Sequence, residues 1–196
     1  MLDETTRLTT ALARSGSTSS DFDLNPGFAP TGLALRPAAV LVGIVAHPNG
    51  ARVILTKRAS HLKHHPGQIA FPGGKQESGD ATLEATALRE AFEEIGVAPN
   101  FVRPIGRLPA HETVTGFQMT PILAEVSGFQ PAPDPGEVEE VFTVPLAHLL
   151  NPARYTVERR QWRGQWRAYY TVPWGPYYIW GATARILRGL AESVGA

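Results

Sequence analysis

The sequence of 196 residues contains no cysteine. A disulfide framework, a thiolate nucleophile and a thiolate zinc site are therefore excluded, and the absence fits a reducing compartment. There is also no excess of either charge, because 18 Lys and Arg residues balance 18 Asp and Glu residues. The chain as a whole thus has no basic field that would draw it to nucleic acid or to an anionic membrane, although local patches are compatible with this balance.

Long apolar stretches are absent as well. No uninterrupted apolar run approaches the length of a membrane span, and the first residues, Met1-Leu-Asp-Glu-Thr5, lack the basic region and apolar run of an export signal. We therefore expect a cytoplasmic protein with no membrane anchor. With 43% hydrophobic residues, the chain is long enough to form one globular core.

The first 35 residues differ in composition from the rest of the chain. Apolar residues at helical spacing predict a short helix over Asp3–Arg14, which is followed by a small, polar stretch at 15–20 and a turn-rich stretch at 25–30. We interpret residues 1–35 as a helix and linker arm, and residues 36–196 as the main domain. A homodimer, with this arm as a contact, is a possibility that the sequence leaves open.

The main domain begins with a near-continuous apolar run at Arg36–Ala46, which is typical of a strand buried on both faces. The turn dipeptide Asn49-Gly50 then predicts a hairpin whose second strand is Ala51–Arg58. Further strands are predicted at 102–108, 118–126 and 140–144, with a late hairpin of 155–160 and 167–172, a short helix at 145–150 and a final helix at 180–194. This mixture of strands and helices predicts a layered α/β domain.

A glycine turn, Phe71-Pro-Gly-Gly74, leads into a helix that ends near Gly96. Glu90, Glu93 and Glu94 stand at i, i+3 and i+4 of this helix, so the three side chains project the same way and repel one another unless a cation lies among them. Mg²⁺ and Mn²⁺ are the natural candidates because both prefer carboxylate and carbonyl oxygens. Such a site suggests phosphate chemistry.

The same helix carries a broad apolar arc. It is formed by Leu83, Ala87, Leu88, Ala91, Phe92 and Ile95. We expect the helix to pack through this arc and to present its acids on the opposite side. Asp80, just before the helix, is interpreted as an N-cap at least as readily as a catalytic acid.

The segment Arg89-Glu-Ala-Phe-Glu-Glu-Ile-Gly-Val97, joined to the preceding Gly-Gly turn, resembles the Nudix box. The first half of the box departs from the family pattern, because Asp80 stands where a Glu is usual and the interval to Arg89 is one residue longer. The preceding stretch, Leu55-Thr-Lys-Arg through Phe71-Pro-Gly-Gly74, is similar to the motif of the coenzyme A pyrophosphatase branch, which also has the Asp and the extra residue. Lys63 stands where that branch usually has Arg.

The resemblance implies a Nudix-type α/β/α sandwich with a mixed sheet. It also implies hydrolysis of the pyrophosphate of coenzyme A or acyl-coenzyme A, dependent on Mg²⁺ or Mn²⁺, giving 3′-phosphoadenosine monophosphate and (acyl-)4′-phosphopantetheine. Carried over by position, the Gly74 carbonyl, Glu90 and Glu94 would hold the metal, with Glu93 as a further ligand or water contact. Arg89 would orient the glutamates through ion pairs.

Other roles are assigned with less support from the pattern. Arg58, Lys63 and Gly73 are predicted to contact substrate phosphates, since coenzyme A carries a 3′-phosphate beside its pyrophosphate. Glu137 is our choice of general base, with Glu140 as an alternative. His64, His65 and His111 are interpreted as loop residues rather than metal ligands, and the late aromatic residues as core more often than as a ligand pocket.

The sequence leaves two alternative functions open. The first is another Nudix hydrolase activity, on an ADP-sugar, a dinucleotide or a damaged nucleoside triphosphate. The second is a non-catalytic ligand sensor on the same fold, which the intact set of acids disfavours. In each case the expected partner is a small molecule rather than nucleic acid.

Overall fold

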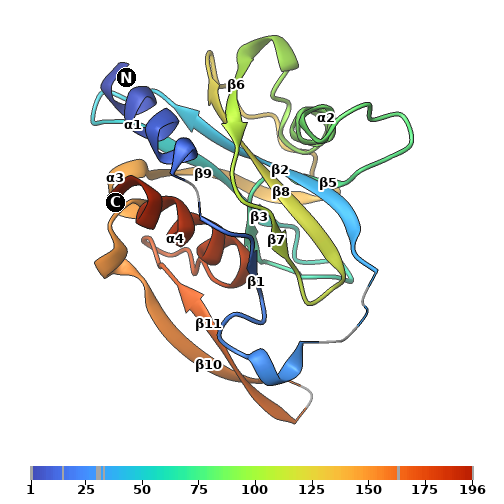
Figure 1. The fold of residues 1–196 in the computed structure, drawn as a ribbon. Coiled ribbons are helices and arrows are strands. Elements are labelled where there is room, and N and C mark those ends of the chain that lie inside the picture. The colour runs from blue at the N-terminus through green and yellow to red at the C-terminus, as the bar shows by residue number, and fades with distance from the viewer. Residues whose placement is uncertain (1, 15, 30–31, 33, 163, 196) are drawn as a thin grey trace.

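The structure is a computed structural model, and it describes residues 2–14, 16–29, 32, 34–162 and 164–195. Within these residues a mixed sheet of nine strands crosses the molecule, and helices cover both of its faces (Figure 1). This architecture confirms the α/β class with a mixed sheet. No helix in the described part of the chain is long and apolar enough to cross a bilayer.

Two long strands form the centre of the sheet. β2 (Arg36–Val45) and β8 (Phe117–Val126) run parallel, in register along the whole length of both strands. β3 (Arg52–Arg58) lies antiparallel to β2 after the turn at Asn49-Gly50, as the sequence predicts. The other strands are β1 (Ser19–Ser20), β4 (Ile69–Ala70), β5 (Gly73–Lys75), β6 (Val102–Arg107), β7 (His111–Glu112) and β9 (Val138–Pro145).

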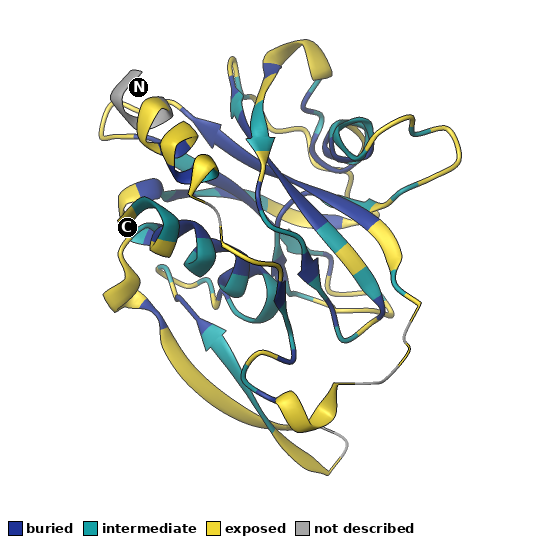
Figure 2. Ribbon diagram, viewed as in Figure 1, coloured by how far each residue is buried: buried dark blue, intermediate teal, exposed yellow. Residues whose placement is uncertain are grey.

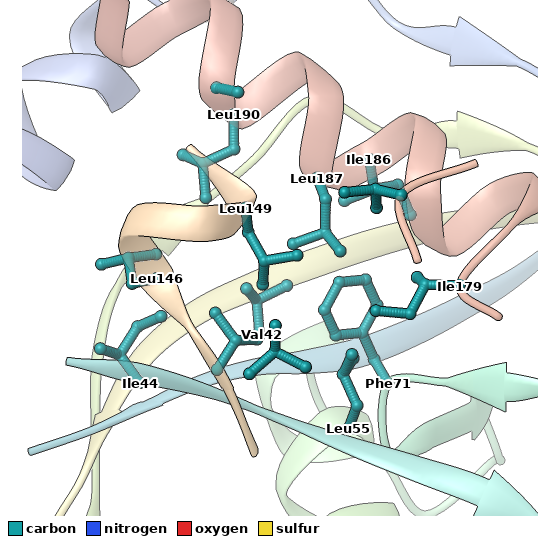
Figure 3. Close-up of a cluster of buried hydrophobic side chains, with 14 of the residues drawn as sticks. Val42, Ile44, Leu55, Phe71, Leu146, Leu149, Ile179, Ile186, Leu187 and Leu190 are labelled. Carbon is teal, nitrogen blue, oxygen red and sulfur yellow. The ribbon is translucent and has the colours of Figure 1, made fainter. Parts of the chain in front are cut away.

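β2 is buried on both faces, as the apolar run predicts. Val40, Val42 and Ile44 face one core cluster, which also contains residues of α3 (Leu146–Leu149) and α4 (Gly181–Gly195). Figure 3 shows the side chains of α3 and α4 meeting those of the sheet. Ala39 and Leu41 face a second cluster under α2 (Leu83–Ile95), where Ala87, Ala91 and Ile95 are fully buried. The sheet therefore separates α2 from α4.

The remaining helical elements lie at the periphery. α1 (Leu2–Ala13) packs on α4 and β6 through the buried residues Leu8 and Ala11. Three short 3-10 turns are η1 (Pro26–Phe28), η2 (Pro99–Phe101) and η3 (Pro152–Arg154). The division of the chain at residue 35 stays a prediction, but α1 shares its core cluster with α4.

The segment that follows α1 connects three parts of the fold. β1 pairs in parallel with β7, and the Asp21 carboxylate and Ser19 hydroxyl contact opposite nitrogens of the buried His111 ring at 3.1 and 2.9 Å. The interpretation of His111 as a loop residue is therefore wrong. Further along, the Asn25 side chain accepts a hydrogen bond from the Ala168 N–H and donates one to the Ala168 carbonyl, each at 2.8 Å.

Candidate active site

The turn between β4 and α2 is built into the sheet by two glycines. β5 pairs with β2, so that Gly73 lies opposite Val40 and Gly74 opposite Ala39. At Gly73, φ is +151° and an added Cβ would lie 2.4 Å from the Ala39 carbonyl oxygen. At Gly74, an added Cβ would lie 2.6 Å from a carboxylate oxygen of Glu90. Gly73 therefore requires glycine because it lies against backbone, whereas the close neighbour of Gly74 is the movable end of the Glu90 side chain.

Two glutamates of α2 lie against this turn. The Gly73 N–H donates to Glu94 Oε2 at 3.0 Å, and the Glu94 side chain is only about 5% exposed. Burial raises the pKa of Glu94 to about 7, and the charges of Glu90 and Glu137 add to the increase. Burial also raises the pKa of Glu90, and Glu93 and Glu137 contribute. Glu90, Glu94 and Glu137 are therefore near enough to disfavour one another's ionisation.

The faces of α2 differ from those that the sequence predicts. Phe92, assigned to the packing arc, is 54% exposed, whereas Glu94, assigned to the opposite side, is buried. Ala87 and Ala91 are the centre of the packed face, and Glu94 follows Ala91 by three residues, so that it lies on the same side. The acids of the helix also differ in exposure, because the Glu93 side chain is 54% exposed whereas that of Glu94 is buried.

Arg89 connects the acids to one another. Its Nε and Nη2 donate to the two oxygens of Asp80, each at 3.0 Å, and Nη1 donates to Glu93 Oε2 at 2.8 Å. Nη2 also lies 3.0 Å from Glu90 Oε1 and 3.2 Å from the carbonyl oxygen of Lys75. The bidentate pair with Arg89 holds the pKa of Asp80 well below its usual range.

The prediction of Asp80 as the N-cap of α2 is wrong. Thr82 caps the helix, and its hydroxyl accepts from the Ala85 N–H at 3.1 Å. Asp80 is instead the acid that fixes Arg89. The signal for this role was its position six residues after Gly74, where the family usually has a Glu.

The end of β3 contributes the remaining polar groups. Arg58 pairs with the start of β9 at a β-bulge, and its Nη1 lies 3.7 Å from Glu94 Oε1. The Ala59 N–H donates to the Glu137 carbonyl at 2.9 Å, which fixes Glu137 beside Arg58. Lys63 is exposed in the loop between β3 and β4, and in the described residues no ion pair joins it to these acids.

The structure thus brings together most of the predicted site. Six of the predicted residues lie together at the end of the sheet under α2, namely Gly73, Gly74, Arg58, Glu90, Glu94 and Glu137. Two more, Arg89 and Glu93, flank them. In the described residues no group of three His, Asp or Glu side chains is already arranged around a metal position. The donors are nevertheless all oxygens, and the mutual repulsion of these carboxylates is what a divalent cation would offset. The residues therefore fit Mg²⁺ or Mn²⁺.

Comparison with known proteins identifies the family. The NUDIX domain model matches residues 35–164. The uncharacterized Nudix hydrolase NudL of Enterobacter sp. (strain 638) is 42% identical over 178 residues, covering 88% of this chain and 90% of NudL. NudL of Salmonella paratyphi B is 42% identical over 173 residues, with the same coverage. The solved Nudix hydrolase RenU of M. smegmatis is 21% identical, with a TM-score of 0.47 over 61% of this chain and 82% of RenU. The chain belongs to the Nudix hydrolase family.

Proposed function

We propose that this Nudix hydrolase cleaves the pyrophosphate bond of coenzyme A or acyl-coenzyme A, giving 3′-phosphoadenosine monophosphate and (acyl-)4′-phosphopantetheine. The observation that supports this substrate is the contact between Arg58 and Glu94. Arg58 belongs to the motif that resembles the coenzyme A pyrophosphatase branch, and its guanidinium is directed at the acids of the Nudix box. A cationic group here suits a substrate rich in phosphate.

The proposal includes a divalent cation held by Glu90, Glu94 and the Gly74 carbonyl, with Glu93 as a further ligand or water contact. When bound, Mg²⁺ or Mn²⁺ offsets the charge that develops on phosphoryl oxygens and lowers the pKa of a bound water. Arg89 is a positioning residue, because it contacts Asp80, Glu90 and Glu93 at once.

Other residues act on the substrate and the attacking water. Arg58, Lys63 and the Gly73 turn bind phosphate oxygens. Glu137 accepts the proton of the water, since its charge is felt by both Glu90 and Glu94. The alternative base, Glu140, already accepts a hydrogen bond from the Tyr177 hydroxyl. We assign the reaction to the cytoplasm, and we keep a homodimer as a prediction.

Product analysis tests the substrate. The purified protein is incubated with Mg²⁺ or Mn²⁺ and coenzyme A, acetyl-coenzyme A or ADP-ribose, and the products are separated and identified by mass spectrometry. We expect phosphopantetheine products from the first two. Cleavage of ADP-ribose with coenzyme A left intact would refute the substrate and keep the metal site. Binding without cleavage of any of them would favour the sensor.

The two glycines of the turn give a matched pair of substitutions. Gly73→Ala forces a Cβ into the backbone of β2 at an unfavourable φ, so we expect it to lower the unfolding free energy by about 2–4 kcal/mol. Gly74→Ala meets only the end of the Glu90 side chain, so the fold should persist while hydrolysis falls at least about tenfold. Urea denaturation and initial rates measure both. Equal loss of stability in the two variants would contradict this distinction.

A further inference from the structure

A hairpin near the C-terminal end of the chain projects from the body of the molecule. Its strands, β10 (Thr156–Trp162) and β11 (Gln165–Thr171), form a two-stranded sheet separate from the nine-stranded one. In Figure 1 this hairpin and α2 lie at opposite ends of the molecule. The hairpin contributes none of the residues assigned to the Nudix site.

One face of the hairpin carries two exposed apolar side chains. The register pairs Val157 with Tyr170 and Gln161 with Trp166, so Val157, Arg159 and Trp166 share a face. Trp166 is 65% exposed and Val157 is 51% exposed. Residues 156–161 of β10 are exposed (Figure 2). Exposed apolar side chains on a projecting element, here beside Arg159, are typical of a surface that binds a membrane or another protein.

The charge of the chain is divided unequally along its length. Residues 151–196 contain seven arginines and two glutamates, and the first 150 residues contain 11 basic and 16 acidic residues, so the two parts have net charges of +5 and −5. The neutral total conceals this division. The one acid of the hairpin, Glu158, lies on the other face and accepts a hydrogen bond from the Tyr178 hydroxyl at 2.6 Å.

Two other arginines of the hairpin, Arg160 and Arg167, pair with each other on the opposite face and lie near aromatic rings. The Arg160 guanidinium lies 5.3 Å from the ring centre of Trp180, and Arg167 lies 5.3 Å from that of Phe22. Such contacts leave the positive charge in place, because a ring does not neutralise it. The hairpin therefore carries positive charge on both faces, and Arg159 is the arginine that shares a face with Trp166.

We propose that this hairpin docks the protein on an anionic lipid surface. Trp166 and Val157 would lie at the level of the headgroups, where tryptophan is enriched at membrane interfaces, and Arg159 on the same face would contact anionic headgroups. The Nudix site lies at the far end of the molecule, so it stays open to solvent in this orientation. The docking is peripheral and reversible, since one tryptophan and a few arginines give weak binding.

Two other occupants fit the hairpin less well. A second copy pairing along the β10 edge would bring the adjacent Arg159 and Arg160 of each copy together, and charged edge strands resist such pairing. A nucleic acid would gain from the arginines, but it would leave the exposed aliphatic Val157 without a partner.

Sedimentation with vesicles tests the proposal. The full chain is mixed at low salt with vesicles of equal parts phosphatidylglycerol and phosphatidylcholine, or of phosphatidylcholine alone. We expect binding to the anionic vesicles that falls as salt rises. Arg159→Gln should weaken it about fivefold and Trp166→Ala about tenfold, from the loss of one charge and one apolar ring at the surface.

Matched controls lie at the other end of the molecule. Phe101→Ala removes an exposed ring, and Arg103→Gln removes an exposed arginine, and neither should change vesicle binding. Hydrolytic rates should be unchanged in Trp166→Ala and Arg159→Gln, so this test is independent of the proposed substrate. Equal binding to both kinds of vesicle, equal binding by all variants, or tighter binding to a single-stranded oligonucleotide with the same sensitivity to Trp166→Ala would overturn the proposal.

Discussion

Glu94→Gln is expected to lower turnover about 10²-fold to 10³-fold while the protein stays folded. Glutamine has the same shape and still accepts from the Gly73 N–H, but it removes the charge that the proposed cation requires. Initial rates with Mg²⁺ or Mn²⁺ measure the loss. The Glu93→Gln substitution should likewise remove most of the turnover. Glu139→Gln is the control, because Glu139 is an acid of the neighbouring strand that pairs with Lys57 on the surface. Near-normal rates in Glu93→Gln and Glu94→Gln would refute the site.

The same substitution has a second readout in the dependence of stability on pH. The pKa of Glu94 rises from an ordinary 4.5 to about 7 on folding, so the native state holds a proton that the unfolded state releases between these values. Without divalent cations, stability should therefore fall as pH rises from 4.5 to 7 and change little above it. Glu94→Gln should flatten this slope in thermal unfolding. If stability depends on pH in the same way in the unsubstituted protein and in Glu94→Gln, Glu94 is not the titrating group.

Arg89→Gln is expected to lower the unfolding free energy by about 3 kcal/mol and to abolish most turnover. The substitution leaves Asp80, whose side chain is 6% exposed, without its bidentate partner, and it releases Glu90 and Glu93. Asp80→Asn should give a smaller loss of both, because the amide keeps one contact with Arg89.

Urea denaturation of Arg89→Gln, Asp80→Asn and the double variant gives the coupling between the two residues. The surface pair Arg103–Glu125 supplies the comparison, since Arg103→Gln should cost less than about 1 kcal/mol. If Arg89→Gln costs no more than Arg103→Gln, the role of Arg89 as the connection among the acids is wrong.

The sequence predicted the elements whose signals are local. The apolar run of β2, the turn at Asn49-Gly50 and the end of α2 at Gly96, which adopts the left-handed conformation with φ of 72°, were all confirmed. Each depends on residues adjacent in the chain. The late hairpin was confirmed for the same reason, with Gly164 at positive φ in its turn.

The candidate site was harder to predict, because its geometry depends on distant partners. A polarity pattern assigns Phe92 inward and Glu94 outward, but it has no information on the Gly73 N–H and Arg58 that stabilise a buried carboxylate. His111 likewise finds its two partners about 90 residues earlier in the chain. β1 is two residues long and too short to carry a pattern of its own.

The contacts of Asn25 and its neighbours have a consequence for the order of folding. Asn25 meets Ala168 across 143 residues, and Arg185 donates to Asp23 at 2.8 Å across 162 residues. These contacts close loops of 143 and 162 residues, so they contribute little until the C-terminal part of the chain is present. During synthesis, the segment after α1 is therefore made early but acquires its partners Ala168 and Arg185 late. The segment can therefore join the sheet through β1 and β7 before it meets β11 and α4.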